Sequence, residues 1–314
     1  MPDQQFLSTV QKLENNIASV VLGKRDVIRF CLVALFAGEH LLLEDVPGVG
    51  KTLLARALAK SISGVFKRIQ FTPDLIPADI TGSNIYNPQK KEFDFVKGPI
   101  FGNILLADEI NRTTPRTQSA MLEAMSERQV SCDGITTVLP PLFMVIATEN
   151  PIEFEGTYPL PESQLDRFLM RVSVGYPERN EELEILNSHQ FSSPIDKLKP
   201  VLSVEDILQI QKEVRKVYVA FDIQNYVLDL IEGTRTSSEL FVGVSPRGGI
   251  AFTHAAQALA FIENRDFVNP DDIKRLAVPV LAHRVITKSF GQTNQREIVE
   301  SIIERLVNTT PTPR

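Results

Sequence analysis

An apolar run that leads straight into a glycine-containing turn constrains this chain more than any other feature. The run covers residues 41–43, and the turn ends in Gly50, Lys51 and Thr52. Glycines allow a tight turn whose backbone amides face inward toward an anion, and a helix is expected directly after it. The sequence therefore predicts a phosphate-binding loop between a strand and a helix, and with it a pocket for a nucleoside triphosphate.

The residues of this loop have separate chemical roles. Lys51 is expected to bring a mobile cation to the outer phosphates, and the hydroxyl of Thr52 can coordinate Mg²⁺. The residues expected to surround the phosphates are Pro47, Gly48, Val49 and Gly50, of which the last three carry a backbone N–H. One position departs from the usual pattern, because Asp45 stands where the first glycine of such loops is found. A carboxylate is unfavourable beside phosphates, so we expect the Asp45 side chain to point away from the pocket.

The composition is that of an ordinary soluble globular chain. It has 314 residues, of which 43% are hydrophobic and 23% charged, enough for roughly two domains. A net charge of −6 and a pI near 5.4 argue against an extended nucleic-acid-binding surface. The most apolar stretch, residues 30–38, is too short to cross a bilayer, and the polar first residues lack a signal-peptide pattern. We therefore expect a cytoplasmic protein without membrane insertion.

Secondary-structure signals divide the chain into two parts. Up to residue 178, helical and strand patterns alternate, which favours an α/β core with a mostly parallel sheet. Two exposed hairpins are predicted within it, one near residues 83–97 and one over residues 130–142 with Asp133-Gly134 as its turn. From residue 179 to 314 the pattern is helical with good N-caps, which predicts a small all-α domain.

Polar residues follow two of the predicted core strands. Asp108 and Glu109 end the apolar run 104–107, and Asn150 follows the run 143–147. Open parallel sheets place ligand sites at the carboxyl ends of their strands. Asp108 is the candidate ligand of Mg²⁺, and Glu109 is the candidate base that activates a water molecule. Because adjacent strand residues face opposite ways, we expect these two carboxylates to have different tasks.

An amide and two arginines complete the candidate set. Asn150 could hydrogen-bond the γ-phosphate and the attacking water. Arg167 ends the core, and Arg247 lies in the first turn of a helix that Ser245-Pro246 opens; each could stabilise charge on a transferring phosphate. Taken singly, an Asn before Pro is more often a turn and an arginine more often a solvated surface group. The order of the signals along one α/β chain favours the functional interpretation.

Three segments are narrower signals than a phosphate-binding loop. They are Arg68-Ile69-Gln70-Phe71-Thr72-Pro73-Asp74-Leu75, Leu106-Ala107-Asp108-Glu109-Ile110-Asn111-Arg112, and Gly156-Thr157-Tyr158-Pro159-Leu160-Pro161-Glu162. With them, the chain resembles the MoxR family of AAA+ ATPases from residue 21 to residue 273.

The resemblance implies roles for individual residues. Lys51 and Thr52 look like the Walker A pair, Asp108 and Glu109 like Walker B, and Asn150 like sensor 1. By the same resemblance, Arg247 looks like sensor 2 and Arg167 like an arginine finger that acts on a neighbouring subunit. The two hairpins look like the helix-2 insert and the insert before sensor 1.

The resemblance also implies an activity, cofactors and partners. It implies ATP and Mg²⁺ as cofactors, a homo-oligomer that is a hexameric ring, and hydrolysis that moves the helical lid against the core to remodel or mature a protein client. Family members of this kind often act with von Willebrand A domain proteins, so such a protein is a candidate client. The alternatives that stay open are a DNA-acting motor, a metal-chelatase-type motor subunit, and an assembly scaffold that binds ATP and rarely hydrolyses it.

Overall fold

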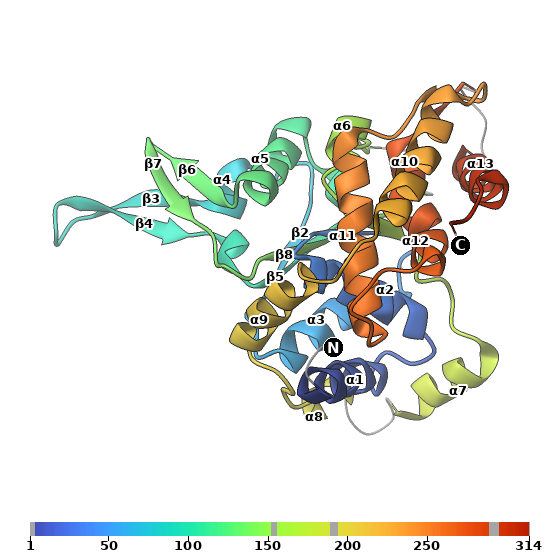
Figure 1. Ribbon diagram of the computed structural model, residues 1–314. Coiled ribbons are helices and arrows are strands. Elements are labelled where there is room, and N and C mark those ends of the chain that lie inside the picture. Colours follow the sequence, from blue (N-terminus) through green and yellow to red (C-terminus); the bar gives the residue numbers. More distant parts are fainter. Residues whose placement is uncertain (1–3, 152–155, 189–193, 289–294, 314) are drawn as a thin grey trace.

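A five-stranded sheet forms the centre of the molecule (Figure 1). The computed structural model describes residues 4–151, 156–188, 194–288 and 295–313. The strands, all parallel, are β1 (Leu41–Glu44), β2 (Phe66–Gln70), β5 (Ile104–Asp108), β8 (Met144–Glu149) and β9 (Met170–Val172). Their order across the sheet is β2-β5-β8-β1-β9, so β1 lies beside β8 and β8 beside β5. The predicted parallel α/β core is confirmed.

Alternation along the central strands sorts their side chains into two cores. On one face, Leu41, Ile104 and Ile146 belong to a large cluster shared with α1 (Gln4–Ala18), α2 (Arg25–Ala37), α3 (Lys51–Ser61) and the lid helices. On the other, Leu42, Leu105 and Val145 pack with residues of α4 (Pro77–Thr81) and α5 (Pro115–Glu127). Burial on both faces explains why these strands read as continuous apolar runs.

Two antiparallel hairpins extend from the same side of the core (Figure 1). They pair β3 (Gly82–Asn87) with β4 (Glu92–Lys97) and β6 (Gln129–Cys132) with β7 (Ile135–Val138). Asp133 and Gly134 have φ of 49° and 80°, as a tight two-residue hairpin turn requires. Both predicted hairpins are confirmed.

The remainder of the chain is mainly helical. Its helices are α6 (Glu162–Leu165), α7 (Arg179–Ser188), α8 (Pro194–Lys197), α9 (Val204–Val214), α10 (Phe221–Thr236), α11 (Pro246–Ile262), α12 (Pro270–Leu281) and α13 (Gln295–Thr309). Ser203, Ser245 and Asn269 accept hydrogen bonds from first-turn N–H groups of α9, α11 and α12, which confirms the predicted caps.

Shorter elements complete the described part of the chain. The 3₁₀ helices are η1 (Pro99–Phe101), η2 (Ile110–Arg112) and η3 (Ala282–Arg284). One addition to the predicted all-helical domain is an antiparallel pair of β10 (Leu240–Val242) and β11 (Ile286–Thr287). These strands are too short for an alternating pattern to be readable. The predicted division after residue 178 stays a prediction.

Candidate nucleotide-binding site

A polar cavity opens at the carboxyl ends of β1, β5 and β8. Its volume is about 420 Å³. The residues that line it are Pro47, Gly48, Gly50, Lys51, Thr52, Leu53, Arg68, Gln70, Asp108, Glu109 and Asn150. The sheet order brings together three loops that are far apart in sequence, because β8 lies between β1 and β5. Sheets of this kind place their ligands at such an edge.

The loop needs its glycines because of their backbone conformation, and not because a side chain would collide with its surroundings. Gly48 and Gly50 have φ of 89° and 93°, in the left-handed region that disfavours other residues. A Cβ atom added at either position would meet nothing within 4 Å. The backbone therefore curves around open space directly before α3, which begins at Lys51. This geometry suits an anion, because helix N-termini present unpaired N–H groups. The side chain of Val49 packs instead against the large core cluster.

Lys51 is held inside the loop by its own backbone. Its Nζ donates to the carbonyl oxygen of Asp45 at 2.6 Å. Burial lowers the pKa of Lys51, against the opposing pull of the carboxylates of Asp45, Asp108 and Glu109. The ammonium is thus partly stripped of water, and within the described structure it is hydrogen-bonded to a carbonyl that an incoming phosphate can replace.

The Asp45 carboxylate points away from the cavity, as predicted. It accepts hydrogen bonds from the Ser173 hydroxyl at 2.8 Å and from the Gly175 N–H at 2.5 Å, just beyond β9. Burial would raise the pKa of Asp45, but these donors and the Val46 N–H hold it below its usual value. Asp45 therefore fastens the start of the loop to the segment that follows β9.

The two acids after β5 both line the cavity. Asp108 ends the strand, whereas Glu109 has φ of 58° and ψ of 51° and begins η2. The expectation that strand alternation would turn them to opposite sides is therefore wrong, because the strand stops between them. Thr148 on β8 fixes both, since its hydroxyl donates to Asp108 at 2.7 Å and accepts from the Glu109 N–H at 2.8 Å.

A chain of side chains links the two carboxylates through β2. The Arg68 Nη2 donates to Asp108 at 2.6 Å and to the Gln70 amide oxygen at 2.7 Å. The Gln70 Nε2 in turn donates to Glu109 at 2.8 Å, and Arg112 pairs with the same carboxylate at 3.2 Å. Sequence reasoning assigned no role to Arg68 or Gln70. The available signal was their alternation with buried Ile69 on a strand beside β5.

The remaining predicted residues divide into two groups. Thr52 lines the cavity, and Asn150 lines it from the end of β8 with only 5% of its surface exposed. Arg167 and Arg247 are not among the lining residues. The Arg167 Nη1 donates to the Leu122 carbonyl at 2.8 Å and to the Ser126 hydroxyl on α5. Arg247 is exposed at the second position of α11. Their roles stay predictions.

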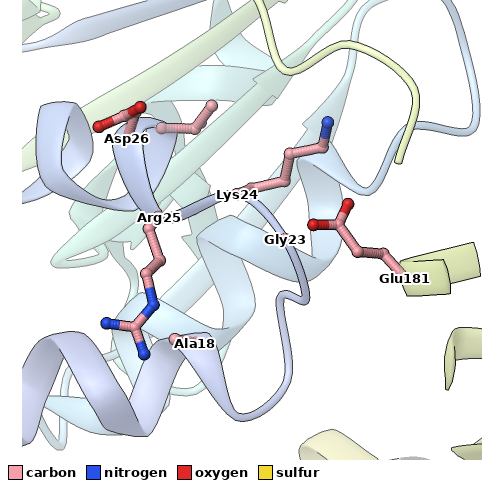
Figure 2. A pocket seen from close by; sticks show the side chains of 7 residues that line it. Ala18, Gly23, Lys24, Arg25, Asp26 and Glu181 are labelled. Carbon is pink, nitrogen blue, oxygen red and sulfur yellow. The ribbon is translucent and has the colours of Figure 1, made fainter. Parts of the chain in front are cut away.

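A second cavity, of about 470 Å³, lies where the turn before α2 meets the start of α7. Figure 2 shows Lys24 and Glu181 on one side of the turn and Arg25 on the other. The Lys24 Nζ donates to the Tyr176 carbonyl at 2.7 Å, and the Glu181 carboxylate accepts from the Glu178 N–H at 2.8 Å while lying against Gly23. The segment that leads into the lid is therefore fastened to the N-terminal turn as well as to Asp45.

Comparison with known proteins identifies the family to which this arrangement belongs. Residues 40–170 match the model of the "ATPase family associated with various cellular activities (AAA)", and residues 232–305 match an AAA lid domain. The chain is 39% identical to "Chaperone MoxR1" of Mycobacterium tuberculosis over 98% of this chain and 83% of that protein. The chain belongs to the MoxR family of AAA+ ATPases.

Two further relatives support membership of the MoxR family. The uncharacterized protein YeaC of Bacillus subtilis is 50% identical, over 96% of this chain and 94% of that protein. The crystal structure of a proposed ATPase from Cytophaga hutchinsonii is 36% identical and superposes with a TM-score of 0.90, covering 99% of this chain and 97% of that one. The AAA+ core and helical lid are thus shared along almost the whole length.

The described residues contain no group of three or more His, Cys, Asp or Glu side chains that could hold a metal ion. None of the described helices has the length and apolar character to cross a bilayer.

Proposed function

We propose that this protein hydrolyses ATP to ADP and phosphate and uses the reaction to remodel or mature a protein client. The observation that carries the proposal is one cavity that combines an open glycine-bearing loop, a buried lysine, two carboxylates and a buried asparagine. These are the groups that phosphoryl transfer to water needs for binding, metal coordination and water activation. Other described cavities lack this combination.

The donors present fit ATP and Mg²⁺. Gly48, Gly50 and the Lys51 ammonium line the space for the phosphates, and Thr52 and Asp108 would supply the hydroxyl and carboxylate oxygens that Mg²⁺ prefers. When bound, the ion offsets charge on the β- and γ-phosphate oxygens. Lys51 and Asp108 must both exchange partners to reach this state. Lys51 leaves the Asp45 carbonyl, and Asp108 leaves Arg68.

Glu109 and Asn150 are assigned to the attacking water. The left-handed backbone at Glu109 aims its carboxylate into the cavity and not along the strand. In this position it can take a proton from a water, while the Asn150 amide holds that water in line with the γ-phosphate. Gln70 and Arg112 both bond the Oε2 atom of Glu109, which holds the carboxylate in place at the cavity.

Arg247 and Arg167 are assigned to stabilise the charge of the transition state, one from the same subunit and the other from a neighbouring subunit. Arg247, at the start of α11, reaches the phosphates of its own subunit when the lid closes. Arg167, at the end of α6, reaches those of a neighbour in a ring that we propose to be hexameric. A guanidinium acting across an interface makes hydrolysis depend on assembly, which ties the chemistry to motion between subunits.

The client is proposed to be a protein, and its partner a von Willebrand A domain protein, in the cytoplasm. The hairpins expose the apolar side chains of Ile85, Phe93, Ile135 and Val138, which supports contact with polypeptide. The net charge of −6 argues against a DNA-acting motor. Binding of DNA that rises at low salt and stimulates hydrolysis would favour that alternative.

The test is a Glu109→Gln variant in the presence of ATP and Mg²⁺. It should bind ATP, assemble, and retain its client for identification by pull-down, with Lys51→Ala as the control that does not bind ATP. Recovery of a metal-binding tetrapyrrole enzyme would instead favour a chelatase-type subunit. A wild-type hydrolysis rate equal to background would favour the scaffold and contradict the proposed activity.

A further inference from the structure

A buried arginine joins the α/β core to the helical lid. Arg284 ends η3, directly after α12, and its side chain is 2% exposed. Its Nε donates to Asp166 at 2.7 Å, immediately after α6. The rest of the guanidinium donates to the carbonyls of Phe168 at 2.6 Å, Leu169 at 3.0 Å and Val280. A buried guanidinium with this many partners fixes the backbone segments around it, because losing any partner leaves a charge unsatisfied.

The Asp166 carboxylate connects a second lid element to the same point. One oxygen accepts from Arg284, and the other accepts from the Ser245 hydroxyl at 3.0 Å. Ser245 is the N-cap of α11, and its hydroxyl accepts from the Gly248 N–H at 3.1 Å. One core carboxylate is therefore bonded to the end of α12 and to the beginning of α11.

Close packing reinforces these bonds. A Cβ atom added at Gly248 would lie 2.9 Å from the Cδ of Arg284, so the first turn of α11 rests directly on the arginine stem. The residues that make this junction, defined as Asp166, Ser245 and Arg284, come from segments more than 30 residues apart in the sequence. The junction leaves little room for one segment to shift without the others.

The two arginines assigned to the transition state are attached to this junction. Arg167 directly follows Asp166, and Arg247 lies two residues after Ser245. The Arg167 side chain points toward α5, where it reaches the Leu122 carbonyl. Thus the residue proposed to act on a neighbour's nucleotide and the residue proposed to act on the subunit's own nucleotide share one support.

We propose that the junction positions Arg167 and Arg247 relative to each other, so that closure of the lid on a subunit's own ATP changes how that subunit presents Arg167 to its neighbour. Arg284 is thereby a positioning residue for hydrolysis at the adjacent site. The inference rests on the proposed function, because it takes Arg167 to act across the subunit interface.

Two variants probe the junction, and two serve as references. Arg284→Lys keeps the charge but removes the planar fork that reaches several acceptors at once. Asp166→Asn keeps the shape and removes the charge, and it replaces Arg284→Lys if that variant does not fold. Arg265→Lys is the matched control, because Arg265 pairs with Asp272 at 2.7 Å entirely within the lid. Arg167→Ala is the reference for loss of the finger itself.

Each variant is assayed alone and mixed in equal amounts with Lys51→Ala subunits, which cannot bind ATP productively but carry an intact Arg167. Alone, Arg284→Lys should hydrolyse ATP at least about tenfold more slowly than wild type and bind a fluorescent ATP analogue within about twofold. In the mixture its hydrolysis should recover in part, because the neighbour now supplies an Arg167 on an intact junction while the variant's own Arg247 stays displaced. The hydrolysis of Arg167→Ala, whose own junction is intact, should recover more fully. Arg265→Lys should stay within about twofold of wild type in both assays.

Specific outcomes overturn the inference. The inference is overturned if Arg284→Lys alone hydrolyses ATP near the wild-type rate. It is also overturned if mixing with Lys51→Ala subunits restores the hydrolysis of Arg167→Ala but not that of Arg284→Lys. If Arg167→Ala itself is not repaired, the proposed action across the interface fails instead. Amide hydrogen exchange then decides the positioning claim alone: faster exchange in both 162–169 and 246–249 of Arg284→Lys supports it, and unchanged exchange in either segment contradicts it.

Discussion

Two arginine–carboxylate pairs of almost equal length lie in very different surroundings. The Arg68–Asp108 pair in the cavity measures 2.6 Å and the Arg284–Asp166 pair at the junction 2.7 Å. The Arg68 side chain is 48% exposed, whereas the Arg284 side chain is 2% exposed. Solvent makes an exposed pair worth little and easily exchanged, while a buried pair cannot be opened without a large cost. Distance alone therefore does not distinguish a contact that must change from one that must hold.

The other partners of these groups follow the same division. In the cavity, Lys51, Asp108 and Glu109 are bonded to groups that a nucleotide or a water can replace. At the junction, Arg284 is bonded mostly to backbone carbonyls, which cannot leave without unfolding a segment. Substitutions in the cavity should alter turnover more than stability, and substitutions at the junction should alter both.

The largest expected effect is on ATP hydrolysis and comes from a substitution in the cavity. Glu109→Gln keeps the size and the hydrogen-bonding oxygen of the side chain but cannot accept a proton. We expect ATP hydrolysis to fall about 10³-fold, since a positioned general base contributes that much. Urea unfolding should shift by less than about 0.5 kcal/mol. Hydrolysis is measured by phosphate release at saturating ATP, and near-normal turnover would remove Glu109 from the role of base.

The next-largest effect concerns the junction and is measured as a change in the free energy of unfolding. Arg284→Ala should lower the free energy of unfolding by about 3 kcal/mol, because it leaves Asp166 and two buried carbonyls without their donor. Arg68→Ala should lower it by less than about 1 kcal/mol, since its pair is exposed to solvent. Both are measured by urea denaturation without nucleotide. Equal losses in the two variants would break the proposed division between exchangeable and fixed pairs.

A partly buried carboxylate, Glu149 at the end of β8, sharpens the comparison through pH. Burial and, to a lesser degree, the neighbouring Glu44 raise the pKa of Glu149 from 4.5 to about 7, against the opposing effect of Arg171. The folded chain therefore holds this proton more tightly than the unfolded chain, and stability falls as pH rises between these two values. Glu149→Gln removes this dependence.

The expected gain of Glu149→Gln is about 2 kcal/mol at pH 8, shrinking below about 1 kcal/mol at pH 5. Thermal or urea unfolding across this range measures it. The matched control is Glu300→Gln, which removes an acid paired with Arg296 on the surface of α13. A Glu149→Gln variant with the same advantage at every pH would show that packing, and not ionisation, is responsible.

Local patterns in the sequence were sufficient for most of the fold. Strand runs with two buried faces, the caps at Ser203 and Ser245, and the Asp133-Gly134 turn each depend on neighbouring residues only. The short β10 and β11 strands were not predicted, because two or three residues cannot display a period. The backbone at Glu109 was not predicted either, since a left-handed conformation at a glutamate outside a hairpin turn has no sequence signature.

The candidate site was predictable where it lies on a motif and not where it depends on tertiary contact. The loop, Asp108 and Asn150 follow their strands directly, and the sheet brings them together. The polar chain through Arg68 and Gln70 depends on β2 pairing with β5, which no local pattern reveals. Arg284 carries no signal at all, because a buried arginine is recognisable only from the partners that surround it.

The smallest effect expected concerns Arg68, and it tests whether the cavity pair is truly exchangeable. Mg²⁺ and the Arg68 guanidinium compete for Asp108, so Arg68→Gln should lower the Mg²⁺ concentration for half-maximal hydrolysis by about threefold, less than 1 kcal/mol. Arg305→Gln, which breaks the exposed pair with Glu239 on the lid, should leave that concentration unchanged. A higher requirement in Arg68→Gln would mean that the arginine assists the metal-bound state and does not merely occupy its ligand, and the cavity pair would then belong with the fixed contacts of the molecule.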